Sequence, residues 1–244
     1  MSDKRGFTLV EILVALGIGV VMLVAIYSMT NLSQKTSSGI ERRVAAQQDE
    51  KTALELMAME IGMASYNPLS IADSLLWVNP ACNAIVGNNP AAAYKGIQVA
   101  TANSITIQMD INDNGSIIGN ANEIISYNYD VNNLYITRET NCGGAQPFLG
   151  DTAASGRTRT VRVINGDTSI YNPVIPVFRY FDGANNDITA TVAGNTSSTT
   201  GIPAIRRIEI TLAVETENPD INNNQRKRMV YSTSVIVRNH VPAM

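Results

Sequence analysis

Hydrophobic side chains dominate the beginning of the chain. Residues 7–27 form an unbroken apolar segment behind a short basic start, and the segment holds a single charged side chain, Glu11. A helix of this length extends about 32 Å, enough to cross a hydrocarbon layer of ~30 Å. A charged side chain at the centre of a membrane helix costs about 2.5–3.5 kcal/mol on insertion scales. Because the segment offers no second charge, Glu11 needs a partner from another molecule or from a newly made N-terminus.

Helical periodicity continues beyond this segment. Residues 28–66 contain no proline, and apolar side chains such as Leu54, Met57 and Ile61 recur at helical spacing. Charged and amide side chains, Glu50 among them, are assigned to the opposite, polar face. Pro68 favours an end near residue 66, because the residue before a proline is disfavoured in a helix. The pattern therefore predicts one helix of about 60 residues, half apolar and half amphipathic.

Past Pro68 the pattern changes to short runs that alternate between apolar and polar positions, which predicts strands. The predicted strands cover residues 104–109, 123–129, 134–138, 161–164, 177–181, 208–215 and 228–238. Asn132-Asn133 predicts a hairpin turn, and the asparagine-rich residues 218–225 connect the last two strands. A helix followed by antiparallel strands gives an α+β fold, in which the long N-terminal helix packs on an antiparallel sheet domain.

Composition and charge exclude several classes of function. Only 16% of the 244 residues are charged, the net charge is −3, and no basic stripe appears, so no nucleic acid is expected as a partner. The sequence contains no glycine-rich phosphate loop, nucleophile elbow or histidine-based dyad. The single histidine, His240, is expected at the surface, and Glu215 and Glu217 are expected to be solvated at a strand end. The sequence therefore predicts a protein that is not an enzyme.

Two cysteines, Cys82 and Cys142, both follow the membrane segment. An exported domain matures in an oxidising compartment, which favours a disulfide between them. Closing so long a loop stabilises the fold by about 4 kcal/mol if the effect is loop-closure entropy. Two unpaired buried thiols are the alternative. The spacing of the cysteines and the single histidine do not fit a zinc site.

Residues 110–115 raise the question of a metal. Their sequence, Asp110-Ile111-Asn112-Asp113-Asn114-Gly115, matches the first half of a calcium-binding EF-hand loop. The twelfth position of that loop, which requires a bidentate glutamate, is Ala121, and Glu123 comes two residues later. The hypothesis is a non-EF-hand Ca²⁺ site that uses Asp110, Asn112, Asn114 and Glu123. The alternative is a hairpin turn without a metal.

The start of the chain resembles a known processing motif. The motif consists of residues 5–11, Arg5-Gly6-Phe7-Thr8-Leu9-Val10-Glu11. It resembles the cleavage and N-methylation motif of type IV pilins and type II secretion pseudopilins. The resemblance implies that prepilin peptidase cleaves after Gly6, that Phe7 is N-methylated, and that Glu11 pairs with the N-terminal amine of a neighbouring subunit. A secretory signal peptide or a plain membrane anchor is the alternative, but neither needs Glu11 or the Gly6-Phe7 junction.

Weaker similarities narrow the resemblance within that family. The strands at residues 177–182, 205–210 and 235–239 resemble those of PilW-type minor pilins and J-type pseudopilins. The chain is bulky for a major pilin, and it lacks the proline that usually kinks the pilin helix. The resemblance thus implies a minor pilin with a leader at residues 1–6, a transmembrane half-helix at 7–27, an amphipathic half-helix at 28–66 and a periplasmic or extracellular β domain at 67–244.

A structural role in fibre assembly follows as the expected function. The resemblance implies a single-pass protein of the bacterial inner membrane that helps to initiate, prime or cap a pilus. Its expected partners are other pilins, prepilin peptidase and the inner-membrane assembly platform. The alternatives are a J-type pseudopilin at the tip of a type II secretion pseudopilus and an adhesin or ligand-binding module at a pilus tip. An anchored periplasmic enzyme is a third class, and the missing catalytic motifs disfavour it.

Overall fold

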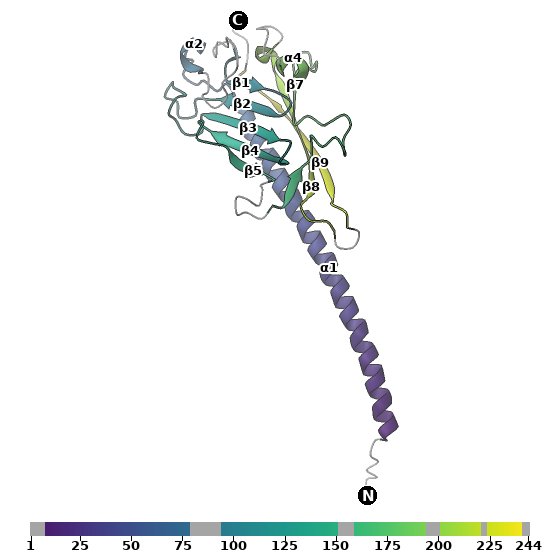
Figure 1. The fold of residues 1–244 in the computed structure, drawn as a ribbon. Coiled ribbons are helices and arrows are strands. Elements are labelled where there is room, and N and C mark those ends of the chain that lie inside the picture. The colour runs from purple at the N-terminus through teal and green to yellow at the C-terminus, as the bar shows by residue number, and fades with distance from the viewer. Residues whose placement is uncertain (1–7, 79–93, 151–158, 194–200, 221–223, 241–244) are drawn as a thin grey trace.

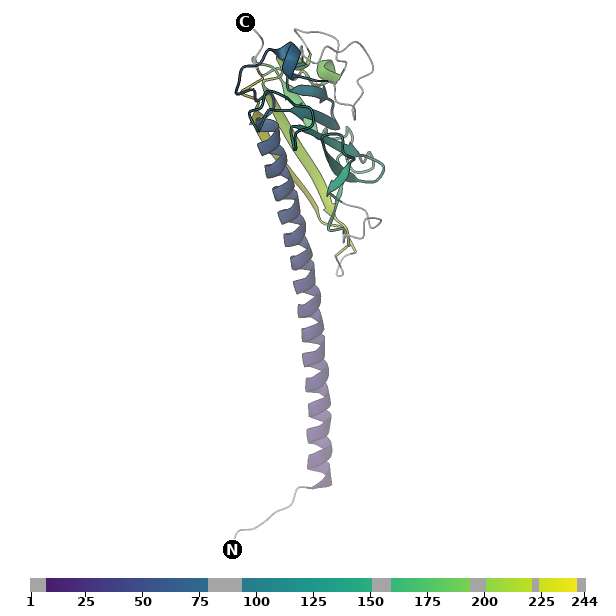
Figure 2. The ribbon, with the colours of Figure 1, turned by 90° about the vertical axis from the view of Figure 1, so that its left-hand side faces the viewer.

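The fold consists of one long helix that carries two antiparallel sheets at its C-terminal end (Figure 1). The computed structural model describes residues 8–78, 94–150, 159–193, 201–220 and 224–240. Helix α1 runs from Leu9 to Gly62, 54 residues, and projects from the sheets as a single rod (Figures 1 and 2). An α+β architecture with a long N-terminal helix is thereby confirmed.

The first sheet has five strands in the order of the sequence, each antiparallel to the next. Its strands are β1 (Ile97–Ala100), β2 (Ser104–Gln108), β3 (Ile124–Asp130), β4 (Tyr135–Thr140) and β5 (Gln146–Leu149). The predicted hairpin is β3–β4, and its turn is held by the Asp130 carboxylate, which accepts hydrogen bonds from the backbone amides of Asn132 and Asn133. The sequence pattern missed β1 and β5.

The second sheet is built around one long strand, β8. Antiparallel to it lie β9 along one edge and β6 and β7 along the other, with β6 and β7 paired to different halves of β8. The strands are β6 (Val161–Val163), β7 (Phe178–Phe181), β8 (Arg207–Thr216) and β9 (Arg228–Ile236). Three short helical segments complete the described fold: α2 (Asp73–Leu76), α4 (Thr189–Ala193) and η3 (Ile202–Ala204).

The two sheets share one core with the C-terminal half of α1. Hydrogen bonds join the sheets directly: the amide of Phe178 donates to the carbonyl of Ala102 (3.0 Å), and the hydroxyl of Tyr180 donates to the carbonyl of Thr101 (2.9 Å). A smaller apolar cluster forms beside this core around Leu76 and Trp77. Burial of one helical face against two sheets explains why half of α1 is fixed while the other half stands free.

Candidate functional site

The free half of α1 exposes an apolar surface along its entire length. Leu9 is 78% exposed and Met29 77% exposed, and the large apolar side chains between them are all exposed as well. Helix α1 is long and apolar enough to cross a membrane, by length and composition, and none of its most apolar window is buried in the fold. In both ribbon views this half of the helix extends away from the sheets (Figures 1 and 2). A continuous apolar surface of this extent marks contact with lipid or with other protein.

Thr8 and Glu11 cap the free end of α1. The Glu11 carboxylate accepts a hydrogen bond from the backbone amide of Thr8 (2.8 Å) and another from the Thr8 hydroxyl (2.9 Å). In return, the Glu11 amide donates to the Thr8 hydroxyl oxygen (3.3 Å). This reciprocal arrangement is a capping box, and it places a carboxylate at the positive end of the helix dipole. The predicted cleavage and methylation positions, Gly6 and Phe7, lie outside the described residues.

The other half of α1 buries a stripe of side chains at helical spacing. The stripe contains Ala46, Glu50, Ala53, Leu54, Met57, Glu60 and Ile61. The assignment of Glu50 to the polar face is therefore wrong, because Glu50 is 0% exposed. Neither of its carboxylate oxygens has a hydrogen-bond partner among the described residues. Burial raises the pKa of Glu50 to about 7, and the nearby backbone amide of Tyr231 in β9, which does not reach hydrogen-bond geometry, offsets only part of that effect.

Glu60, the second acid in the buried stripe, connects α1 to the first sheet. Its carboxylate receives two hydrogen bonds from the guanidinium of Arg138 in β4, at 2.6 and 3.1 Å, and one from the hydroxyl of Tyr127 in β3. The bidentate pairing fixes the geometry as well as the charge balance. Burial raises the pKa of the Tyr127 hydroxyl, and the Glu60 carboxylate adds to that rise, so Tyr127 remains a donor. Glu60 thus fixes the orientation of the helix against the sheet.

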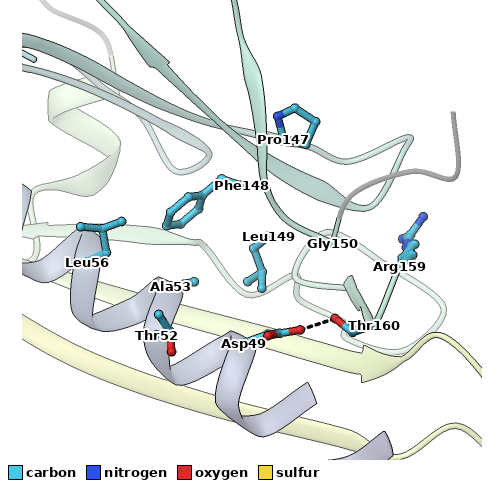
Figure 3. A pocket seen from close by; sticks show the side chains of 10 residues that line it. All are labelled: Asp49, Thr52, Ala53, Leu56, Pro147, Phe148, Leu149, Gly150, Arg159 and Thr160. Carbon is cyan, nitrogen blue, oxygen red and sulfur yellow. Dashed lines mark hydrogen bonds between the residues drawn. The ribbon is translucent and has the colours of Figure 1, made fainter. Parts of the chain in front are cut away.

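A groove of ≈ 300 Å³ lies between α1 and the edge strand β5. Leu56 on the helix and Phe148 on the strand form its apolar side (Figure 3). At its polar end, the Thr160 hydroxyl donates a hydrogen bond to the Asp49 carboxylate (Figure 3). The described residues that line the groove include no histidine or cysteine.

His240 is buried and serves the structure, so the expectation of a surface position is wrong. It is 1% exposed, and its Nε2 lies 2.9 Å from the carbonyl oxygen of Ile202. A carbonyl only accepts, which places the proton on Nε2 and leaves Nδ1 to accept from the Ser65 hydroxyl at 2.8 Å. The Ser65 oxygen in turn accepts from the amide of Gly96 (3.0 Å), and a side chain at Gly96 would collide with the Ser65 backbone. Burial lowers the pKa of His240 to about 4.

The two glutamates at the end of β8 are also less solvated than expected. Glu217 forms a bidentate pair with Arg162, with hydrogen bonds of 2.7 and 2.9 Å. Glu215 is 7% exposed and lies 3.7 Å from the guanidinium nitrogens of Arg226 and Arg228. Both carboxylates are less solvated than expected because Arg162, Arg226 and Arg228 from neighbouring segments contact them at the end of the strand.

The predicted calcium residues come together in the connection between β2 and β3. Asp110 and Glu123 are both 0% exposed. The Asp110 carboxylate accepts from the amides of Asn114 (3.2 Å) and Gly115 (2.9 Å), and the Asn112 side chain accepts from the same Asn114 amide (3.1 Å). No three His, Cys, Asp or Glu side chains gather into a metal-binding group within the described ranges. Any ion here would rely on amide and backbone oxygens as well.

Cys142 follows β4 in the turn at Asn141, where both residues have positive φ. Cys142 is disulfide-bonded. Cys82, the other cysteine of the sequence, lies outside the described residues, so the Cys82–Cys142 pairing stays a prediction.

Comparison with known proteins identifies the N-terminal segment. Residues 1–27 match the family described as the prokaryotic N-terminal methylation motif. The chain therefore carries a prepilin-type N-terminus followed by a long apolar helix, which is consistent with a type IV pilin-like protein. No curated protein and no solved structure matches the chain significantly.

Proposed function

We propose that this chain is a minor type IV pilin, a structural subunit that helps to initiate, prime or cap a pilus. One observation carries the proposal: the methylation motif at residues 1–27 continues directly into an apolar helix that no described part of the chain covers. Such a helix requires an apolar environment. The bilayer supplies that environment before assembly, and the helices of neighbouring subunits supply it in the fibre.

Processing follows from the motif. The match at residues 1–27 implies a prepilin peptidase substrate that assembles with other pilins. We propose cleavage after Gly6, which makes Phe7 the new N-terminus, and methylation of its amine. That amine would lie one residue from Thr8, which already donates to the Glu11 carboxylate.

Glu11 has a proposed role at two stages. While the subunit waits in the membrane, the two hydrogen bonds from Thr8 and the helix dipole stabilise the Glu11 carboxylate locally. During assembly, the amine of a neighbour's Phe7 would pair with the carboxylate and set the axial register between subunits. A low-dielectric surrounding makes such a charge pair stronger than it would be in water.

The remaining features support a minor rather than a major component. The chain carries two sheets of five and four strands on one helix. The sequence of α1 contains no proline, and α1 is a single uninterrupted helix. We propose that the β domain lies in the periplasm before assembly and that it determines which subunits are adjacent in the fibre. The inner-membrane assembly platform would be its partner at that stage.

A J-type pseudopilin of a type II secretion system uses the same chemistry in another machine. The neighbouring genes separate the two, because pilus assembly genes favour the first and secretion genes the second. An adhesin or ligand-binding module at the pilus tip is a further candidate, favoured by the groove between α1 and β5. Specific binding in a screen against surface glycans and matrix proteins would favour the adhesin or ligand-binding module.

The test of the proposal replaces Glu11 with alanine in the producing organism. The control is Glu41→Ala, which removes an exposed glutamate from the same helix, 30 residues further along. We expect both variants to be processed and to reach the membrane. Only Glu11→Ala should disappear from the fibre fraction sheared from the cells, as measured by immunoblot. Wild-type amounts of Glu11→Ala in that fraction would contradict the registration role.

A further inference from the structure

The connection between β2 and β3 begins and ends on two fully buried carboxylates, Asp110 and Glu123. One Glu123 oxygen, Oε1, accepts from the backbone amides of Ile111 (3.2 Å) and Asn112 (3.3 Å). These two bonds direct the Glu123 carboxylate into the turn that Asp110 opens. Residues far apart in the loop therefore bring their charges together at its base.

The second oxygen of Glu123, Oε2, is buried and has no hydrogen-bond partner among the described residues. A buried polar atom without a partner costs about 1–3 kcal/mol, and more when it is charged. Native structures rarely leave such an atom without a partner, and a bound ion is one recognised explanation. This unpartnered oxygen of Glu123 is the strongest indication that the loop binds an ion.

Charge balance leads to the same conclusion. No lysine or arginine of the described residues forms an ion pair with Asp110 or Glu123. Two buried carboxylates that repel one another need a cation, and the described chain does not supply one.

Two other oxygens of the loop share one contact, the side-chain amide of Asn120. Nδ2 of Asn120 lies 2.6 Å from the carbonyl oxygen of Ser116 and 3.4 Å from the side-chain oxygen of Asn114. The side-chain amide of Asn120 thus contacts two oxygen acceptors of the loop that a metal ion could bind instead. The carboxylate and carbonyl oxygens concerned each keep a lone pair for a ligand bond.

We propose that this loop binds a Ca²⁺ ion through oxygen ligands from Asp110, Asn112, Asn114, Glu123 and the backbone carbonyl of Ser116. Calcium takes six to eight oxygen ligands in flexible geometry, and water can complete the set. The absence of sulfur and imidazole ligands disfavours transition metals. Glu123 supplies the second charged ligand from two residues beyond its usual EF-hand position. In an EF-hand the second helix positions the last glutamate ligand, whereas here the loop itself would position Glu123.

A bound ion would stiffen the contact between this loop and the segment after α1. Gly115, with φ of +74°, sits against Ile71, where an added side chain would come within 3.3 Å. Ile117 belongs to the small apolar cluster of Leu76 and Trp77. Calcium binding would therefore fix the end of the β domain farthest from the free half of α1, and subunit contacts made there would depend on calcium.

The test uses the full chain purified in detergent, stripped of metal with a chelator and titrated with CaCl₂. Extracellular calcium modules bind with dissociation constants of about 0.1–1 mM, which sets the range of the calorimetric titration. At tenfold excess over the dissociation constant we expect the midpoint of thermal unfolding to rise by about 3–6 °C. The chelator should reverse this rise, and MgCl₂ at the same concentration should not reproduce it.

Three variants make the assignment specific. Glu123→Gln should weaken calcium binding by about tenfold or more, because a charged ligand is lost. Asn120→Asp, which adds a carboxylate to the cluster, should tighten it. Asp182→Asn is the matched control, since Asp182 holds a similar turn by accepting from the amides of Ala184 and Asn186. It should bind calcium like the wild type.

The wild-type titration alone can overturn the proposal. No heat and no change in unfolding midpoint up to 10-fold above the range of about 0.1–1 mM would exclude the site. An equal response to Mg²⁺, or the same response in Glu123→Gln as in the wild type, would also contradict it. If Glu123→Gln fails to fold, Asn120→Asp and the wild type still decide the outcome.

Discussion

Glu50 gives the sharpest prediction about stability, because a titratable group is enclosed between α1 and the sheets without a hydrogen-bond partner. Its pKa is raised from 4.5 to about 7 by burial. In the unfolded chain the carboxyl returns to its ordinary value, so between those two pH values the folded state binds more protons than the unfolded state. Glu50 therefore imposes no penalty below pH ~4.5, and the penalty grows as the pH rises through about 7.

The size of the penalty follows from the shift. Each pKa unit corresponds to 1.36 kcal/mol, so the shift amounts to about 3 kcal/mol of lost stability above pH 7. Glu50→Gln keeps the shape of the side chain but removes the charge. We expect the variant to gain about 3 kcal/mol relative to the wild type between pH 4.5 and pH 8. The gain compares the free energies of unfolding of the variant and the wild type at two pH values, so the contributions of all other titrating groups cancel.

The assay is urea unfolding of the full chain in detergent at a series of pH values and constant ionic strength, followed by the fluorescence of Trp77. Glu55→Gln is the matched control, because Glu55 lies on the exposed face of the same helix. Its stability relative to the wild type should not change with pH. A pH-independent difference for Glu50→Gln, or a variant that is less stable than the wild type at pH 8, would refute the reasoning.

Two further predictions concern buried polar groups. Arg138→Met leaves the Glu60 carboxylate without its cation. Urea unfolding should show a loss of stability near the lower end of about 3–5 kcal/mol, since Arg138 is partly exposed. The double variant with Glu60→Gln should recover most of this loss, and additive losses would contradict the pairing. His240 has its pKa lowered from 6.5 to about 4, so its contribution is complete above pH ~6.5 and lost as the pH falls toward 4, by about 3 kcal/mol. Acid unfolding of His240→Gln should lack this component, and an unchanged acid transition would count against it.

The clearest predicted strands, β2, β3 and β8, alternate in sequence between apolar and polar side chains, although the fold buries most residues of β2 and β3 on both faces. β8 and β9 are the longest strands, and their pairing was predicted from the connection between them. β1 was missed because it spans only four residues, Ile97–Ala100, too few for an alternating pattern to stand out. β5 escaped because Pro147 argues against a strand, and an edge position is where a proline is tolerated.

The buried acids were missed for a different reason. Glu50 stands in the same helical register as Ala46, Ala53 and Met57, so its burial could have been predicted from spacing, but its charge argued for the polar face. The contact of Glu60 with Arg138 joins residues 78 positions apart, and no local pattern carries such information. For the loop at Asp110 the sequence grouped Asp110, Asn112 and Asn114 in one turn, because an EF-hand half-loop is local, and calcium binding there stays a prediction.

The N-terminal peptide of protein recovered from the sheared fibre fraction tests the central claim most directly. We predict that mass spectrometry finds a chain that begins at Phe7 and carries one methyl group on its N-terminal amine. A chain that begins at Met1, or one cut after the apolar segment, would contradict assembly through a processed prepilin-type helix.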